Sequence, residues 1–352
     1  MLLAAISFLF LVKFGPTTCS THQDSYFCGL VEDTILNTDW MTCLQACHNK
    51  ASCISYNYGR RDKTCEMISD GVTNQCDSGK VIYSRGWVFH QIRPLPQKQV
   101  IAELGASPSN PGESCLDILD RRSSYGSVKN GAYYIRIGQK TSFIYCLMEN
   151  TPGCKNGGWT LAMKINGNKG TFSYSSDLWK NTEAHNPEEA NNLDEKETKF
   201  SFYADAQIAV GLCVGMKVQG HTRWLELKIP YNDKSLFGIF GLHSTQPLSG
   251  IDSSQWKSLI NGSSMPENCP SSKKSGFNVQ RESSAVGAKA RLGLIARSRD
   301  PCGGDPDTRI GFGTAGSIGG TDPNNTCGNV YISSSGAPIN KSIKAFCYIF
   351  IK

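Results

Sequence analysis

The chain has 352 residues, with 36 lysines and arginines against 30 aspartates and glutamates, a net charge of +6. This small excess is spread along the sequence without a basic cluster, which argues against a nucleic-acid-binding protein. It is also not the acidic balance expected of a protein that binds mineral cations by charge alone.

The first twenty residues predict a signal peptide, residues 1–20. The apolar run from Met1 to Val12 has the length of a signal-peptide core and is too short to cross a bilayer as a helix. Small residues follow it, which places cleavage near Cys19 or Ser20. A buried N-terminal helix is the alternative interpretation. No later segment reaches about 18 consecutive apolar residues, so the sequence predicts no membrane span.

The cysteines favour an oxidising compartment. Fifteen are present, and removal of Cys19 with the signal peptide leaves an even number that can pair completely. No Cys-x-x-Cys or His-Glu-x-x-His motif occurs, so the sequence carries no motif for a zinc site or for thioredoxin-type redox chemistry. We therefore expect the cysteines to form disulfide bonds in a secreted protein. Three Asn-x-Ser/Thr sequons agree with export and predict glycosylation at Asn261, Asn324 and Asn340.

A proline-rich segment separates two groups of cysteines. Six cysteines lie from Cys28 to Cys76, and the next is Cys115. Four prolines within residues 93–112 withdraw backbone donors from regular structure, so we predict a linker there. The expected domains are residues 24–92 and residues 113–352.

The first domain carries a recognisable pattern. Residues 38–49 predict a helix that Thr38 or Asp39 can cap, with two cysteines four positions apart on one face. Alternating apolar residues predict strands at residues 53–58 and 81–89. A helix with Cys-x3-Cys, followed by Cys-x-Ser-Tyr-Asn-Tyr and a later cysteine, resembles a PAN/apple domain. The resemblance implies one helix on a small antiparallel sheet and the disulfide bonds Cys28–Cys76, Cys43–Cys65 and Cys47–Cys53.

The second domain begins with a capped helix and three short strands between glycine turns. In order, it carries Ser-Cys at residues 114–115, Gly-x-Tyr-x-Ile at 131–135, Tyr-Cys-x-Met-Glu at 145–149 and Gly-Gly-Trp-Thr at 157–160. This combination resembles the start of fibrinogen C-terminal-like domains, which include ficolin- and intelectin-type lectins. It implies an α+β fold and the bond Cys115–Cys146. The paired tryptophans usual in these lectins are missing here.

Two further features bear on that family's calcium loop and disulfide bonds. Asp305 and Asp307 place two carboxylates in one turn, at the position where a fibrinogen-type domain carries its calcium loop. Calcium prefers several oxygen ligands from such a loop, and both a calcium site and a plain Asx-Pro turn stay open. Closure of the glycine-rich segment favours a bond Cys302–Cys327. No pairing is assigned to Cys154, Cys213, Cys269 and Cys347.

Other motifs predict no chemistry. The Gly-x-Gly-x-x-Gly at residues 311–316 is not followed by a helical sequence, which favours a surface loop over a dinucleotide site. The acidic residues within 183–197 favour a solvated surface over cation or mineral binding. No Gly-x-Ser-x-Gly elbow occurs, so we do not expect an enzyme. Four tryptophans are more typical of core positions than of sugar-stacking surfaces: Trp159, Trp179, Trp224 and Trp256.

These features predict a secreted extracellular protein that binds glycans or matrix proteins, with calcium as an open question. The two-domain layout also resembles the secreted skeletal organic matrix proteins of stony corals. The alternative is therefore a purely structural component of an extracellular or mineralised matrix, in contact with a mineral surface. A secreted enzyme ranks third.

Overall fold

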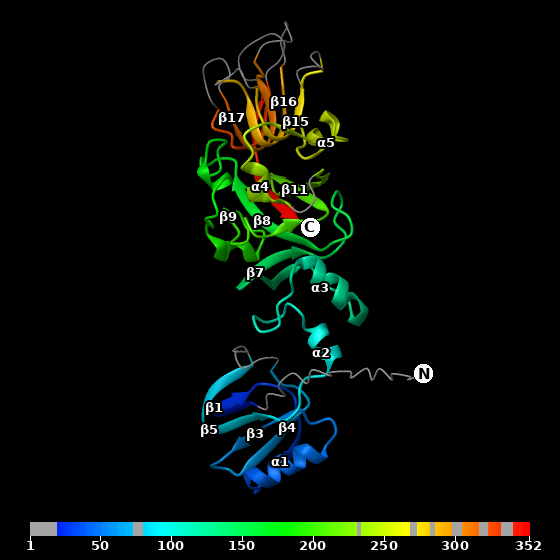
Figure 1. Ribbon diagram of the computed structural model, residues 1–352, viewed down its shortest axis with the longest axis vertical. Helices are drawn as coiled ribbons and strands as arrows, with labels where there is room; N and C mark the ends of the chain where they lie inside the picture. The colour runs from blue at the N-terminus through cyan, green and yellow to red at the C-terminus, as the bar shows by residue number, and fades with distance from the viewer. Residues whose placement is uncertain are drawn as a thin grey trace, which may run out of the picture. The chain divides into compact units, whose positions relative to one another are not determined.

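The computed structural model describes residues 20–72, 80–230, 234–267, 273–281, 286–297, 305–316, 323–331 and 341–352. The chain divides into two compact units, Met1–Glu103 and Leu104–Lys352 (Figure 1). Strands outnumber helices in both, and several disulfide bonds are present, as expected for a disulfide-rich α+β protein. The predicted signal peptide lies outside the described residues. No helix of the described residues is long and apolar enough to span a membrane.

The first unit contains a five-stranded antiparallel sheet in the order β1-β5-β3-β4-β2. Its elements are β1 (Ser20–Phe27), β2 (Val31–Ile35), α1 (Trp40–Asn49), β3 (Ser55–Gly59), β4 (Thr64–Ile68) and β5 (Val81–Gln91). Helix α1 begins after Asp39, whose carboxylate accepts a hydrogen bond from the Thr42 N–H at 2.8 Å. The helix and the strands β3 and β5 match the predicted ones within a few residues.

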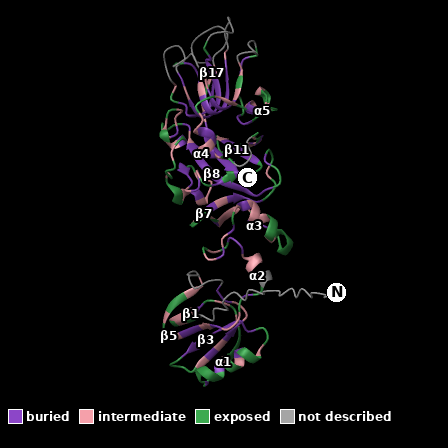
Figure 2. Cartoon of the chain, viewed as in Figure 1, coloured by how far each residue is buried: buried purple, intermediate pink, exposed green. Residues whose placement is uncertain are grey.

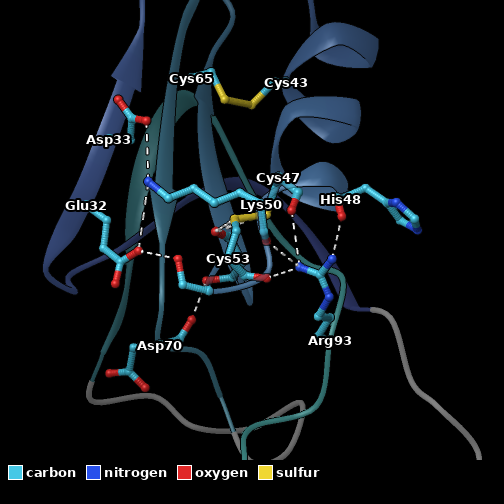
Figure 3. Close-up of a disulfide and its surroundings, with 12 residues drawn as sticks. Glu32, Asp33, Cys43, Cys47, His48, Lys50, Cys53, Cys65, Asp70 and Arg93 are labelled. Carbon is cyan, nitrogen blue, oxygen red and sulfur yellow. Dashed lines mark hydrogen bonds and ion pairs between the residues drawn. A yellow bond between two sulfur atoms is a disulfide. The ribbon is translucent and has the colours of Figure 1, made fainter.

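Two disulfide bonds attach α1 to the rest of the first unit. Cys43 and Cys47 occupy the buried face of the helix, and they bond to Cys65 on β4 and to Cys53 before β3 (Figure 3). These are two of the bonds that the PAN/apple resemblance implied. Because so small a unit buries little apolar surface, each bond is expected to contribute about 2–5 kcal/mol to its stability.

The third implied bond of this unit stays a prediction. Cys28 is exposed and has no disulfide partner among the described residues. Its expected partner, Cys76, lies outside the described residues.

Arg93 closes the C-terminal end of α1 (Figure 3). Its guanidinium donates to the carbonyl oxygens of Cys47 and Lys50 at 3.1 Å each, and to that of His48 at 2.5 Å. A fourth hydrogen bond goes to the carbonyl oxygen of Cys53. The last carbonyls of a helix have no partner within the helix, and a cation is favoured beside them. Arg93 therefore joins the end of the helix to the end of the sheet.

The segment expected to be a linker contains the division between the two units, which falls after residue 103. Residues 93–112 also include Arg93, helix α2 (Gln97–Ala102) and Leu104, which is buried in the core of the second unit. The four prolines stand outside α2, so they do not interrupt it.

The second unit contains two large antiparallel sheets and a small pair, β10 with β13. A seven-stranded sheet has the order β12-β11-β20-β8-β7-β6, with β9 paired to β8. The elements that form or flank it are α3 (Cys115–Arg122), η1 (Ser123–Tyr125), β6 (Gly131–Ile137), β7 (Lys140–Leu147), β8 (Trp159–Asn166), η2 (Asp177–Trp179), η3 (Pro187–Asn191), β9 (Thr198–Lys199), β10 (Gln207–Ile208), β11 (Gly211–Val218), β12 (His221–Lys228) and β20 (Phe346–Ile351).

A six-stranded sheet follows in the order β14-β15-β16-β17-β18-β19. The remaining elements are β13 (Lys234–Ser235), α4 (Leu236–Phe240), β14 (Gln246–Pro247), α5 (Ser253–Ser258), β15 (Lys274–Val279), β16 (Lys289–Ala296), β17 (Thr308–Ala315), β18 (Cys327–Tyr331) and β19 (Lys341–Lys344). After β19 the chain leaves this sheet. The last strand, β20, lies in the seven-stranded sheet between β8 and β11 (Figure 1).

One continuous hydrophobic core joins the two sheets (Figure 2). Trp159, Trp179 and Trp256 are at most 1 % exposed, which confirms the predicted core positions. Trp224 is half-buried and packs against the rings of Tyr348 and Phe350, with centroids 5.6 and 5.7 Å away. The side chains of these four tryptophans therefore contribute to packing within the second unit.

The Gly-x-Gly-x-x-Gly motif is part of a buried strand, so the expected surface loop is wrong. Gly311 and Gly313 lie in β17, which pairs with β16. A Cβ on Gly311 would lie 2.3 Å from the Leu292 carbonyl oxygen, and its φ is +155°. The glycines permit close approach of two strands, a use that the sequence motif does not distinguish from phosphate binding.

Three disulfide bonds lie among the described residues of the second unit. Cys115–Cys146 joins α3 to β7, as the fibrinogen resemblance implied. Cys154–Cys213 and Cys327–Cys347 are also present. The expected bond Cys302–Cys327 is therefore wrong. Closure of the glycine-rich segment favoured it, but strand β20 brings Cys347 beside β18, where Ala345 N–H donates to the Cys327 carbonyl oxygen at 2.9 Å. Cys269 and Cys302 lie outside the described residues.

Candidate functional site

A cleft of about 590 Å³ opens in the second unit, within the range of roughly 300–1,000 Å³ typical of ligand pockets. It lies between the start of α3, the β6–β7 turn, β8, β10 and the end of β20. Apolar side chains and polar ones both line it. The apolar ones include Leu116, Ile135, Ile137 and Ile351, and the polar ones Glu113, Arg136, Asp205, Gln207 and Lys352. We call this feature the α3–β6 cleft.

The start of α3 is fixed against β8. Ser114 caps the helix, because its hydroxyl accepts a hydrogen bond from the Asp117 N–H at 3.0 Å. The Cys115 N–H donates to the Thr160 hydroxyl of β8 at 3.2 Å. Gly158 has a φ of +75° and allows the chain to pass close to Leu116. The segments that resemble fibrinogen-type domains thus form one wall of the cleft.

The edge of the seven-stranded sheet is already covered beside this cleft. Arg136 N–H donates to the Gly112 carbonyl at 2.8 Å, and Tyr134 N–H donates to the Gly105 carbonyl at 2.9 Å. Gly112 N–H in turn donates to the Tyr134 carbonyl at 3.0 Å. An edge strand satisfied in this way offers an incoming peptide strand few free backbone groups.

The polar side chains of the cleft are held in place by neighbours. Arg136 donates to the Thr141 hydroxyl and to the Pro108 carbonyl, at 3.2 Å each. Asp205 lies 3.5 Å from the Lys140 ammonium in an exposed ion pair. Lys352 donates to the Asn156 carbonyl at 3.3 Å, and its pKa is lowered by burial. The cleft therefore presents two cations held by hydrogen bonds, Arg136 and Lys352, beside an apolar surface.

The two aspartates of the expected calcium loop have different environments. The Asp305 carboxylate lies 3.5 Å from the Arg281 guanidinium, and its carbonyl accepts from Arg297 at 2.9 Å. Asp307 is only 5 % exposed and accepts from the Thr308 hydroxyl at 3.4 Å. Within the described residues, no group of three or more His, Cys, Asp or Glu side chains is arranged to hold a metal ion. Residues 298–304 lie outside that part, and calcium binding stays a prediction.

The sequons are placed as follows. Asn261 and Asn324 are both exposed, and their glycosylation stays a prediction. Asn340 lies outside the described residues.

Within the acidic segment Glu197 is buried, so the expected solvated surface is wrong for this residue. Glu197 is 4 % exposed, and its carboxylate accepts from the Asn166 N–H at 3.0 Å. Asp194 accepts at 2.5 Å from Lys164, an ammonium that is fully buried on β8. The sequence did not indicate that Lys164 is buried and paired, because the strand around it shows an otherwise mostly apolar pattern.

Lys199 is a second fully buried lysine, on β9, and it has only neutral hydrogen-bond partners. Its ammonium donates to the carbonyl and side-chain oxygens of Asn181 at 2.8 and 2.7 Å, and it lies 4.2 Å from the centre of the Tyr203 ring. Burial lowers the pKa of Lys199 to about 8, with the charge of Glu183 acting in the opposite direction.

This pKa predicts a rise in stability at alkaline pH. Folded Lys199 loses its proton near pH 8, whereas an unfolded lysine keeps it to about pH 10.4. The unfolded state then binds more protons, so the free energy of unfolding should increase between about pH 8 and pH 9.5. Lys199→Met should lack this part of the increase in urea unfolding at each pH. Equal slopes in the two proteins would contradict the assignment.

No family model matches the chain, and no curated protein is significantly similar to it. The α3–β6 cleft is therefore the feature of the chain from which we infer a function. Sequence reasoning did not find the cleft, because Arg136, Asp205 and Lys352 are far apart in the chain and belong to no motif.

Proposed function

We propose that this chain is a secreted binding protein of the extracellular matrix, and that its α3–β6 cleft binds a glycan. The observation that carries the proposal is the composition of the cleft. Its apolar side chains suit the C–H face of a sugar ring. Its carboxylates, amide and cations suit the hydroxyl groups around that ring. The resemblance of this unit to fibrinogen-type lectins is consistent with such a ligand.

The covered edge of β6 favours a glycan over an extended matrix peptide. A peptide that added a strand to this sheet would need the backbone groups of Tyr134 and Arg136, which are bonded to residues 105–112. Matrix proteins remain the second ligand class, and the PAN/apple-like first unit is the part we assign to them. Two unlike modules on one chain would then bridge two partners.

Binding of the purified mature protein to an immobilised glycan panel tests the proposal. We expect saturable binding, and a weakening of at least about tenfold, or ~1.4 kcal/mol, in Ala209→Trp. Ala209 is exposed and lines the cleft, so a large ring there fills it without entering the core. Val210→Trp is the matched control. Val210 is the next residue, is 46 % exposed and does not line the cleft.

The other outcomes are equally specific. Binding that is lost with chelator, and in the double variant Asp305→Ala with Asp307→Ala, would assign the ligand to a calcium loop and contradict the cleft. Equal affinities of the two tryptophan variants would also contradict it. If no glycan binds saturably, a purely structural component of an extracellular or mineralised matrix becomes the better account.

A further inference from the structure

A second cavity, of about 310 Å³, lies elsewhere in the second unit, between the loop that follows β8 and the segment that enters β18. Most of the residues that line it are polar, among them Asn168, Lys169, Ser173, Thr314, Asn324 and Thr326, and apolar atoms form about half of its surface. Its volume is at the small end of the range for ligand pockets, roughly 300–1,000 Å³. Asn324 is both a wall of this cavity and the acceptor of a sequon.

The sequon itself fixes Asn324 at the cavity. The Thr326 hydroxyl donates to the carbonyl oxygens of Asn166 and Lys169, at 3.2 and 2.7 Å. Thr326 N–H donates to the Gly167 carbonyl at 3.2 Å. These bonds tie the sequon to the loop that forms the opposite wall. Asn324 is exposed and has a left-handed φ of +48°, two residues before this anchor.

We propose that Asn324 is N-glycosylated and that the first N-acetylglucosamine of its glycan is seated in this cavity. The cavity offers the sugar the side chains of Asn168 and Ser173 and the ammonium of Lys169. Asn168 Nδ2 also donates to Asn166 Oδ1 at 3.2 Å, and the Lys169 ammonium lies 4.0 Å from the Glu197 carboxylate. The protein's own glycan would then connect the loop after β8, from the seven-stranded sheet, to the start of β18 in the six-stranded sheet. The inference rests on passage through the secretory route, which is part of the proposed function.

The modification precedes the seating. On transfer to the unfolded chain, Asn324 Nδ2 forms a bond to C1 of the sugar. The bond between C1 and the oxygen of a lipid-linked pyrophosphate donor breaks, and the amide loses one proton. Folding then brings the sequon against the loop after β8 and places the sugar beside the cavity wall.

Asn261 provides an internal control. It is exposed, in the turn after α5, and it lines neither this cavity nor the α3–β6 cleft. A Cβ built on the neighbouring Gly262 meets no atom within 4 Å, so the surroundings of this sequon are open. A glycan on Asn261 should therefore project freely into solvent.

The test is the rate at which peptide:N-glycosidase releases each glycan from the native full-length protein, secreted from animal cells and followed by site-resolved mass spectrometry. We expect release from Asn324 to be about tenfold slower than from Asn261, the factor for ~1.4 kcal/mol of docking by a few hydrogen bonds. After denaturation, the two rates should become equal. Equal rates in the native protein would overturn the seating while leaving secretion intact.

Two variants sharpen this result. A Cβ on Gly170 meets no atom within 4 Å, and Gly170 lines the cavity, so Gly170→Trp should fill it and raise the Asn324 release rate to that of Asn261. Gly131→Trp, at an equally open glycine of β6, should leave the slow release unchanged. Slow release that persists in Gly170→Trp would contradict the seating. A secreted protein with a bare Asn324 would contradict the modification, and failure to be secreted would contradict the proposed function instead.

Discussion

Replacement of Asp194 by alanine should lower the free energy of unfolding of the second unit by about 3–5 kcal/mol. The Lys164 ammonium is fully buried and donates to the Asp194 carboxylate at 2.5 Å. Its other acceptors are the carbonyl and side-chain oxygens of Asn192, at 3.2 and 3.3 Å. Without the carboxylate, a charge remains in the interior with neutral partners alone. Removal of one partner therefore lowers the free energy of unfolding by more than the intact pair adds to it.

Urea unfolding of the variant, followed by tryptophan fluorescence, measures this effect. The double variant Lys164→Met with Asp194→Ala should recover most of the loss, because it removes the buried charge together with its partner. Glu149→Ala is the matched control, since Glu149 accepts from the 70 % exposed Lys129 at 2.9 Å. An ion pair with so exposed a partner is worth about 0–1 kcal/mol. A cost for Asp194→Ala no larger than that of Glu149→Ala would contradict the role given to Asp194.

Local structure was predictable where a few adjacent residues decide it. Asp39 and Ser114 cap helices in the expected places, because a cap needs only one side chain and the next turn. The bonds Cys43–Cys65 and Cys47–Cys53 are those that the resemblance to PAN/apple domains implies, and Cys115–Cys146 is the one implied by the resemblance of residues 114–160 to the start of fibrinogen-type domains.

Features made by distant segments were not predictable in the same way. The bond Cys327–Cys347 depends on the path of β20, which leaves one sheet and inserts into the middle of another. The α3–β6 cleft likewise joins residues near 113 to Asp205 and Lys352. Lys164 shows the same limit, because a lysine in an apolar strand pattern predicts an exposed position. Only the approach of Asp194 from a later loop makes its burial tolerable.

Arg93→Ala should destabilise the first unit by about 2–4 kcal/mol, since hydrogen bonds to a charged group are worth roughly 1.5–3 kcal/mol each and do not add fully. Four carbonyl oxygens at the end of α1 and before β3 would lose their donor. Arg93→Lys should recover less than half of the loss, because an ammonium lacks the planar fork that reaches several carbonyls at once.

Amide hydrogen exchange of the full chain separates this effect from the second unit. Protection should fall in α1 and β3 and stay unchanged in β8 and β11, which belong to the other unit. Arg85→Ala, at an exposed position of β5, is the control and should change stability by no more than about 0.5 kcal/mol. If Arg93→Ala behaved like Arg85→Ala, water would have to satisfy the helix end as well as the guanidinium does. Residue 93 would then belong to the connection between the units, as its proline-rich sequence first indicated, and the two disulfide bonds, with the packing of Leu44 and Ala46, would hold α1 to the sheet.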